Sequence, residues 1–177
     1  MSSKRFAMML LLLLGLTRCA TVPGLPLQPK VDLSRYSGRW YIIANIPYFA
    51  ENGKVGSYFD ISLHKNRIYD DYVGYPAKFT AKPFRFRMVA RVVPGFGNAY
   101  WRESPIWPLT FAYLILYVDA DYQTALVGYP GLKYGWVLAR VPVLPPATYQ
   151  ALLSRLATIG YDTSKFRIVQ QNPLKEQ

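Results

Sequence analysis

Apolar and polar residues alternate along most of the chain between residues 40 and 141, in short runs separated by turn residues. Alternation of this kind is typical of β-strands with one buried and one exposed face. The pattern predicts eight consecutive strands, at residues 40–47, 55–63, 67–74, 84–93, 99–104, 111–118, 124–129 and 134–141.

The clearest alternation is in residues 84–93, FRFRMVARVV, where every second residue belongs to an apolar set and the residues between them include three arginines. Since neighbouring side chains of a strand point to opposite faces of the sheet, one face of this strand is apolar and the other largely basic. We expect the apolar set to point inward and the arginines outward. The apolar set is Phe84, Phe86 and Met88, and the arginines are Arg85, Arg87 and Arg91.

Two segments depart from this alternation. Residues 111–118, FAYLILYV, are apolar on both faces, which indicates a strand that is covered on both sides. Residues 145–160 begin with two prolines, carry apolar residues at helical spacing and end at Gly160, which predicts a helix. Packed outside the sheet, this helix would cover the second face of 111–118. A short ninth strand is expected at 166–170.

Eight successive antiparallel strands with short connections can close on themselves, which removes exposed sheet edges. A closed barrel of eight strands either fills with side chains or holds one small ligand. The expected fold is therefore all-β, an eight-stranded antiparallel up-and-down barrel with one C-terminal helix packed outside and a short ninth strand.

The first residues have the layout of a secretory signal. Lys4 and Arg5 precede an apolar run at residues 6–16, which is too short to span a membrane as a helix. The only cysteine of the chain, Cys19, follows in the stretch LTRC. This stretch resembles a bacterial lipobox, in which the cysteine is acylated and becomes the new N-terminus, although Arg18 stands where such boxes usually carry a small residue. The alternative is a free or buried thiol.

These features predict the domain organisation. Residues 1–18 form a signal peptide, 19–31 a lipidated N-terminus with a flexible, proline-rich tether, 32–172 the barrel domain and 173–177 a tail. With a single cysteine, no disulfide can form within the chain, so the core alone must stabilise the fold.

The composition and net charge of the chain limit the kinds of binding partner that we expect. Hydrophobic residues make up 51 % of the chain and charged residues 18 %, as expected for a folded domain with a sizeable core. The net charge is +11, and it falls by three to +8 if residues 1–18, with Lys4, Arg5 and Arg18, are removed. A basic surface suits an anionic membrane or nucleic acid. The body of the chain has no run of more than two basic residues, so nucleic acid is not expected.

Three stretches resemble the signature motifs of the lipocalin family. YSGRWYIIANIP at 36–47 contains Gly38 and Trp40, VDADYQTALVGYP at 118–130 contains Asp121 and Tyr122, and YGWVLARVP at 134–142 contains Arg140. With the lipobox-like cysteine, the chain resembles the bacterial outer-membrane lipoprotein lipocalins, and GFGNAYW at 95–101 fits a subgroup of them.

The resemblance implies structural roles for these signature residues. Trp40 would plug the closed end of the barrel, with the Arg140 guanidinium on its indole, and Asp121 and Tyr122 would fix a turn. None of them would touch a ligand. The resemblance also implies attachment to the bacterial outer membrane through acylated Cys19, with the protein facing the periplasm. Ala20 rather than aspartate follows the cysteine, which agrees with sorting to the outer membrane.

Apolar residues on the strands are the candidates for a ligand-lining set. They are Phe59, Phe84, Phe86, Met88, Trp101, Tyr113, Ile115 and Trp136. Such a lining suits a fatty acid, a lysophospholipid or a similar amphiphile, bound for envelope lipid transport, storage or maintenance. The same residues could simply fill a core, which would leave a membrane-tethered interaction module without a usable cavity. A homodimer is a further possibility.

The residues offer little for catalysis. His64 is the only histidine, and no nucleophile motif, phosphate-binding loop or dinucleotide fingerprint is present in the sequence. Asp70 and Asp71 could suggest acid–base chemistry, but such a pair is more often a solvated strand end, and neighbours on a strand point to opposite faces. We therefore expect no catalytic residues, metal site or cofactor, and a lipid-modifying enzyme is disfavoured.

Overall fold

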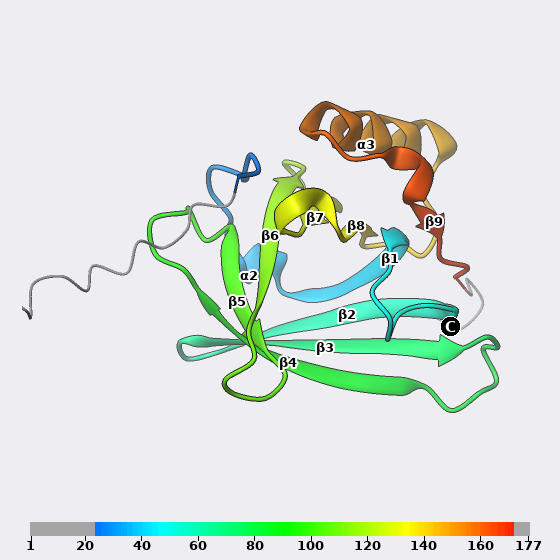
Figure 1. Cartoon of the computed structure of the whole chain (residues 1–177), viewed down its shortest axis with the longest axis horizontal. Coiled ribbons are helices and arrows are strands. Elements are labelled where there is room, and N and C mark those ends of the chain that lie inside the picture. The colour runs from blue at the N-terminus through cyan, green and yellow to red at the C-terminus, as the bar shows by residue number, and fades with distance from the viewer. Residues whose placement is uncertain (1–23, 172–177) are drawn as a thin grey trace, which may run out of the picture.

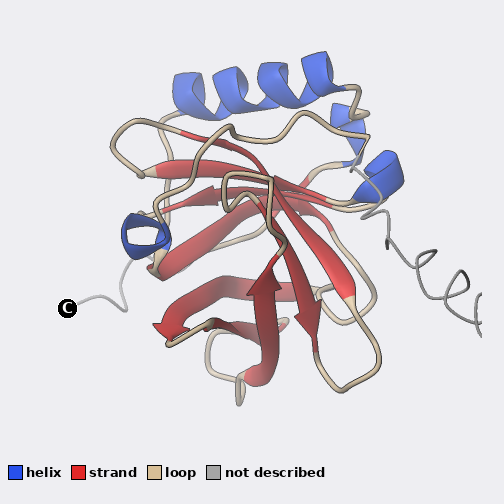
Figure 2. Cartoon of the chain, turned by 90° about the vertical axis from the view of Figure 1, so that its left-hand side faces the viewer, coloured by secondary structure: helices blue, strands red, loops and turns tan. Residues whose placement is uncertain are grey.

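The computed structural model describes residues 24–171, and the predicted signal peptide, Cys19 and the tail lie outside this range. Eight strands form one antiparallel sheet, in which β1 pairs with both β8 and β2 and so closes the barrel (Figures 1 and 2). The predicted fold class is confirmed. The strands are β1 (Gly38–Ile46), β2 (Lys54–His64), β3 (Arg67–Pro76), β4 (Phe84–Val92), β5 (Tyr100–Ser104), β6 (Phe111–Val118), β7 (Thr124–Gly128) and β8 (Gly135–Ala139).

A ninth strand, β9 (Arg167–Ile168), pairs with β1 outside the barrel at Ala44 and Asn45. Strand β1 pairs with β2 only through its first part, up to Tyr41. The C-terminal segment continues along this edge, where the Gly56 amide donates to the Gln170 carbonyl at 2.7 Å. The C-terminal segment therefore bridges β1 and β2 beyond the point where the two strands stop pairing with each other.

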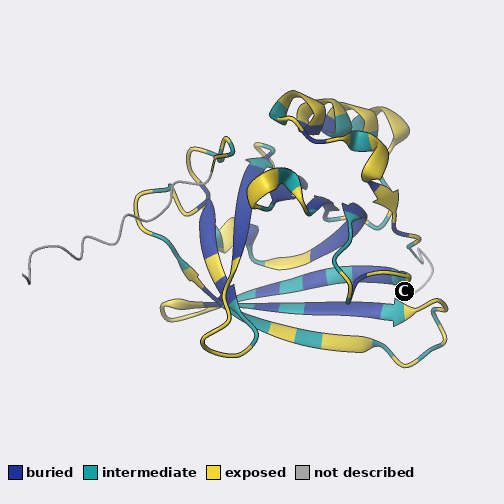
Figure 3. Ribbon diagram, in the orientation of Figure 1, coloured by how far each residue is buried: buried dark blue, intermediate teal, exposed yellow. Residues whose placement is uncertain are grey.

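The helix predicted near the C-terminus is α3 (Pro146–Ile159), and it ends at Gly160, whose φ is +108°. It lies across the outside of the barrel (Figures 1 and 2). Leu152 and Leu156 of α3 share one buried cluster with Leu114 and Leu116 of β6. On its other face β6 adds Tyr113 and Ile115 to the cluster inside the barrel. This explains why 111–118 is apolar on both faces (Figure 3).

The closed end of the barrel is sealed by the short helix α2 (Leu33–Tyr36) and by Trp40, whose side chain is buried. The Arg140 guanidinium carbon lies 3.7 Å from the centre of the Trp40 ring. Gly38 enters β1 with φ +99°, and a Cβ there would lie 3.3 Å from Arg140 Nη1. A glycine at this position therefore permits both the left-handed backbone and the approach of the guanidinium.

The turn between β6 and β7 is organised by a residue that the sequence did not single out. The Asp119 carboxylate accepts hydrogen bonds from the Gln123 amide at 2.7 Å and the Thr124 amide at 2.9 Å. Tyr122 adopts a positive φ of +58°, and its hydroxyl accepts from the Asp32 amide at 2.8 Å. Asp121 accepts from Gln123 only through its backbone carbonyl. The side chain that fixes this turn is that of Asp119.

Part of the segment assigned to the tether is held against the barrel. The Gln28 amide donates to the Ile115 carbonyl at 2.9 Å, and the Val31 amide to the Gly97 carbonyl at 2.8 Å. A Cβ on Gly97, where φ is +56°, would collide with the Pro29 carbonyl. The chain that leads into α2 therefore packs directly against the stretch 95–101.

Two short 3₁₀ helices complete the described chain, η1 (Pro130–Leu132) between β7 and β8 and η2 (Thr163–Lys165) after α3. Within residues 24–171, no helix combines the length and apolar character that crossing a membrane requires.

Candidate functional site

A cavity of about 460 Å³ occupies the open half of the barrel. Its wall is mostly aromatic or aliphatic, and it reaches from the β1–β2 loop at residues 47–53 down to the middle of β3, β5 and β6. Six of the sequence-predicted lining residues are on this wall, namely Phe59, Phe84, Phe86, Met88, Tyr113 and Trp136. The inward orientation expected for the apolar residues of β4 is thus the one that the structure shows.

Trp101 and Ile115, also predicted to line a ligand site, are not on the cavity wall. Both are completely buried in the cluster that fills the lower half of the barrel. Trp101 stacks on Tyr113 with ring centres 4.7 Å apart, and its indole N–H donates to the Asn98 carbonyl at 2.7 Å. These two side chains form the packed floor beneath the cavity.

The β1–β2 loop is pinned over the cavity by Glu51. This carboxyl accepts a hydrogen bond from Trp136 Nε1 at 2.9 Å and another from Asn45 Nδ2 at 3.0 Å. Only 4 % of Glu51 is exposed, and burial raises its pKa to about 8, against the lowering effect of these hydrogen bonds. Burial therefore favours the neutral form of the Glu51 carboxyl.

Deeper in the cavity, Asp70 of β3 and Glu103 of β5 form a carboxyl pair. Their exposed fractions are 2 % and 5 %, and both reach the cavity wall. Burial raises the pKa of both groups, and a hydrogen bond from Glu103 to Asp70 requires that the pair hold a proton. Among the described residues, no N–H or hydroxyl group donates to Asp70 Oδ1 or Glu103 Oε1.

This pair corrects one interpretation of the sequence. Asp70 and Asp71 were expected to be a solvated strand end, but Asp70 is buried and Asp71 is partly exposed, in an ion pair with Arg87 at 2.7 Å. The difference follows from the alternation of β3, which turns Asp70 inward beside Met88 of β4.

Glu51 and Glu103 were not predicted as site residues at all. Glu103 has the same parity as Trp101 on β5, which was a usable signal for an inward side chain. Glu51 gave no such signal, because it lies in a loop without periodicity.

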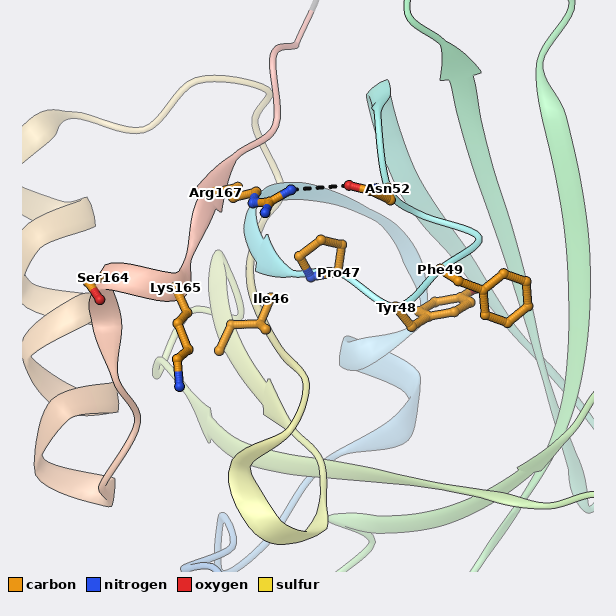
Figure 4. A pocket seen from close by; sticks show the side chains of 8 residues that line it. All are labelled: Ile46, Pro47, Tyr48, Phe49, Asn52, Ser164, Lys165 and Arg167. Atoms are coloured by element: carbon orange, nitrogen blue, oxygen red, sulfur yellow. Dashed lines mark hydrogen bonds between the residues drawn. The ribbon is translucent and has the colours of Figure 1, made fainter.

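A second hollow lies outside the barrel, between the β1–β2 loop and η2–β9, with a volume of about 500 Å³. Figure 4 shows Ser164, Lys165 and Arg167 on one side, and Tyr48 and Phe49 on the other. Arg167 Nη1 donates to Asn52 Oδ1 at 3.2 Å across the hollow. This hollow is an open surface groove with basic residues along one side, whereas the barrel cavity is walled by apolar side chains.

The polar groups of the cavity wall are carboxyls and tyrosine hydroxyls, and among the described residues serine, threonine, cysteine, histidine and lysine do not line it. Within residues 24–171, no group of three or more histidine, cysteine, aspartate or glutamate side chains is arranged to hold a metal ion. What remains is an apolar chamber with buried carboxyls, which can enclose an apolar molecule and hydrogen-bond one polar group.

Comparison with known proteins agrees with this architecture. The lipocalin-like domain model matches residues 31–171. The outer membrane lipoprotein Blc of Escherichia coli is 30 % identical over 161 residues, covering 84 % of each chain. Temperature-induced lipocalin-1 of Arabidopsis thaliana is 28 % identical over 169 residues, covering 80 % of each.

Solved structures show the same fold at lower identity. Insecticyanin from the tobacco hornworm Manduca sexta superposes with a TM-score of 0.64 at 16 % identity, covering 85 % of this chain and 86 % of that one. Lobster apocrustacyanin A1 gives 0.63 at 13 % identity, with 84 % and 91 % covered. The domain match, the closed barrel and the Trp40–Arg140 seal together place this chain in the lipocalin family.

Proposed function

We propose that this chain is a lipid-anchored carrier that binds a fatty acid, a lysophospholipid or a comparable amphiphile in the barrel cavity, and so serves envelope lipid transport, storage or maintenance. The cavity itself carries the proposal, because about 460 Å³ is within the range of small-ligand sites and its wall is mainly apolar. An interaction module without a usable cavity would instead need a barrel filled to its mouth.

The rim of the cavity supports exchange of ligand with a lipid surface. Phe49 in the β1–β2 loop is 92 % exposed, and Trp107 in the β5–β6 loop is 86 % exposed. Pro105 and Leu109 of the same β5–β6 loop line the cavity, so Trp107 stands beside its mouth. Exposed aromatic side chains grouped at one end of a protein are typical of membrane or partner contacts.

The anchor would be acylated Cys19, which lies outside the described residues. The similarity to outer membrane lipoprotein Blc supports a place in the bacterial envelope. The periplasmic face and a homodimer remain part of the proposal. Cys19→Ala should move the protein from the membrane fraction to the soluble fraction, and an unchanged distribution would refute the anchor.

Native mass spectrometry of the purified mature chain is the direct test of the carrier role. We expect co-purified lipid, and a shift of tryptophan fluorescence and melting temperature when lysophospholipid is added. If no lipid co-purifies and neither signal moves, the carrier proposal fails.

A matched pair of variants ties binding to the cavity. Met88→Trp places a large ring in the chamber and should weaken lysophospholipid binding by about tenfold or more. Val89→Trp adds the same ring on the opposite face of β4 and should leave binding within about twofold. Equal effects of the two variants would place the ligand elsewhere. Circular dichroism of both variants checks that they fold.

A further inference from the structure

The ionisable residues of the cavity wall differ in kind from those of the whole chain. Lysine and arginine outnumber acids by 21 to 10 over the sequence. The cavity wall nevertheless carries three carboxyls, Glu51, Asp70 and Glu103, and no lysine, arginine or histidine. A site built for an anionic head group would present the opposite arrangement.

Asp70 and Glu103 are hydrogen-bonded to each other, and the other described side chains and amides add nothing to this pair at Asp70 Oδ1 and Glu103 Oε1. Glu51 is satisfied by Trp136 and Asn45. Asp70 Oδ1 and Glu103 Oε1 receive no hydrogen bond from the described N–H and hydroxyl groups, although both residues are at least nine-tenths buried. Buried polar atoms without a partner are rare and costly, so their presence on a cavity wall requires an explanation.

Four hydroxyl groups of the barrel interior are engaged in pairs. The Tyr36 and Tyr113 hydroxyls lie 3.0 Å apart, and the Ser57 and Tyr72 hydroxyls 3.1 Å apart. Arg87 of the neighbouring strand β4 is bound to Asp71 on the outer face of the sheet. A molecule bound in the cavity can therefore supply a further donor to the Asp70–Glu103 pair.

We propose that the cavity selects apolar ligands that carry a protonated amine, and that this amine lies against the Asp70–Glu103 pair. The proposal rests on the carrier function above and narrows its ligand class. An ammonium group supplies only donors, and its charge-assisted hydrogen bonds to carboxylates are about twice as strong as neutral ones. Burial of the empty pair raises the pKa of Asp70, and a bound cation opposes that shift by favouring the ionised carboxylate.

The aromatic wall suits such a ligand as well. Tyr129, Tyr134 and Trp136 line the cavity near its mouth, and Phe59, Phe86 and Tyr113 line it further in. Their rings accept an alkyl chain and also tolerate the passage of a cation. A fatty acid would instead bring a carboxylate to a chamber that already holds three carboxyls.

Three ligands with one tail and different head groups test the proposal. Binding of dodecylamine, dodecanol and dodecanoate to the full mature chain at pH 7 is measured by calorimetry, below the concentration at which each ligand forms micelles. We expect dodecylamine to bind roughly tenfold to a hundredfold more tightly than dodecanoate, with dodecanol between them. Dodecanoate binding as tightly as the amine would overturn the proposal. If none of the three binds although lysophospholipid does, the amine proposal fails and the carrier function stands.

Substitutions test whether the preference for the amine depends on the Asp70–Glu103 pair. The double change Asp70→Asn with Glu103→Gln keeps the size of both side chains, and should bring the amine to within about threefold of dodecanol. Asp71→Asn, on the next residue and the opposite face of β3, should keep the full preference. An amine preference that survives the double change would overturn the placement. Dodecanol binding by the double variant shows that its cavity remains intact.

Discussion

The ionisable groups at the two ends of the barrel differ in how many hydrogen bonds they make. At the closed end, Arg140 donates from Nη2 to the carbonyls of Arg35 at 2.7 Å and Ser37 at 2.9 Å, and from Nη1 to that of Arg39 at 2.7 Å, while its plane covers Trp40. In the cavity, Asp70 and Glu103 have only each other. A partly buried charge with several hydrogen-bond acceptors stabilises the fold, whereas a buried carboxyl pair with oxygens that receive no other donor costs stability and is available to a ligand.

The largest expected effect concerns the closed end. Trp40 is completely buried, and its indole N–H donates to the Tyr36 carbonyl at 2.7 Å. Trp40→Ala should lower the free energy of unfolding by about 3–5 kcal/mol, since it leaves a cavity and removes the ring beneath Arg140. Urea denaturation measures this loss. The control is Trp107→Ala at the exposed rim, which should change stability by less than about 0.5 kcal/mol. Similar losses in the two variants would contradict the structural role of Trp40.

The second effect has the opposite sign. Burial raises the pKa of Asp70 well above its ordinary value, so the folded state holds a proton that the unfolded state releases. Wild-type stability should therefore fall as the pH rises from about 4 to about 8. Asp70→Asn removes the contribution of Asp70 to this dependence, while Glu103 and Glu51 keep theirs, and should raise the free energy of unfolding by about 2–4 kcal/mol at pH 8, with little change at pH 4.

Denaturation curves of both proteins at pH 4, 6 and 8 give the comparison. Asp71→Asn is the matched control, because Arg87 lowers the pKa of Asp71 and its ion pair is exposed, so the effect should stay within about 1 kcal/mol. Parallel pH profiles for wild type and Asp70→Asn would mean that Asp70 is already ionised in the folded state.

The difference between the ends also explains what the sequence could reveal. The strands, α3 and the seal of Trp40 and Arg140 follow from local periodicity and from three short motifs. The carboxyls of the cavity come from a loop and from two strands that are separate in the sequence, and their burial depends on barrel closure. The alternation along the strand predicts that Asp70 and Asp71 lie on opposite faces of the sheet. It does not show which of the two faces lies inside the barrel, which only the fold reveals.

Gly38 provides a smaller test of the closed end. A Cβ at this position must adopt φ +99° and lies 3.3 Å from Arg140 Nη1, so the guanidinium has to shift by a few tenths of an ångström. Gly38→Ala should lower the free energy of unfolding by about 1–2 kcal/mol. Gly24→Ala, where a Cβ meets nothing within 4 Å, should be close to neutral. Thermal melts of the two variants rank them, and equal melting temperatures would show that the entry to β1 tolerates a side chain.

The smallest effect is spectroscopic and concerns the loop over the cavity. Trp136 Nε1 donates to Glu51, whose pKa is raised to about 8 by burial, whereas the indoles of Trp40 and Trp101 donate to backbone carbonyls. Ionisation of Glu51 should change the emission of Trp136 between about pH 7 and 9. Glu51→Gln should abolish this titration while lowering stability at pH 6 by less than about 1 kcal/mol, because a neutral carboxyl and an amide offer similar hydrogen bonds. A fluorescence titration that persists in Glu51→Gln would assign the transition to the Asp70–Glu103 pair and leave the β1–β2 loop without a role in it.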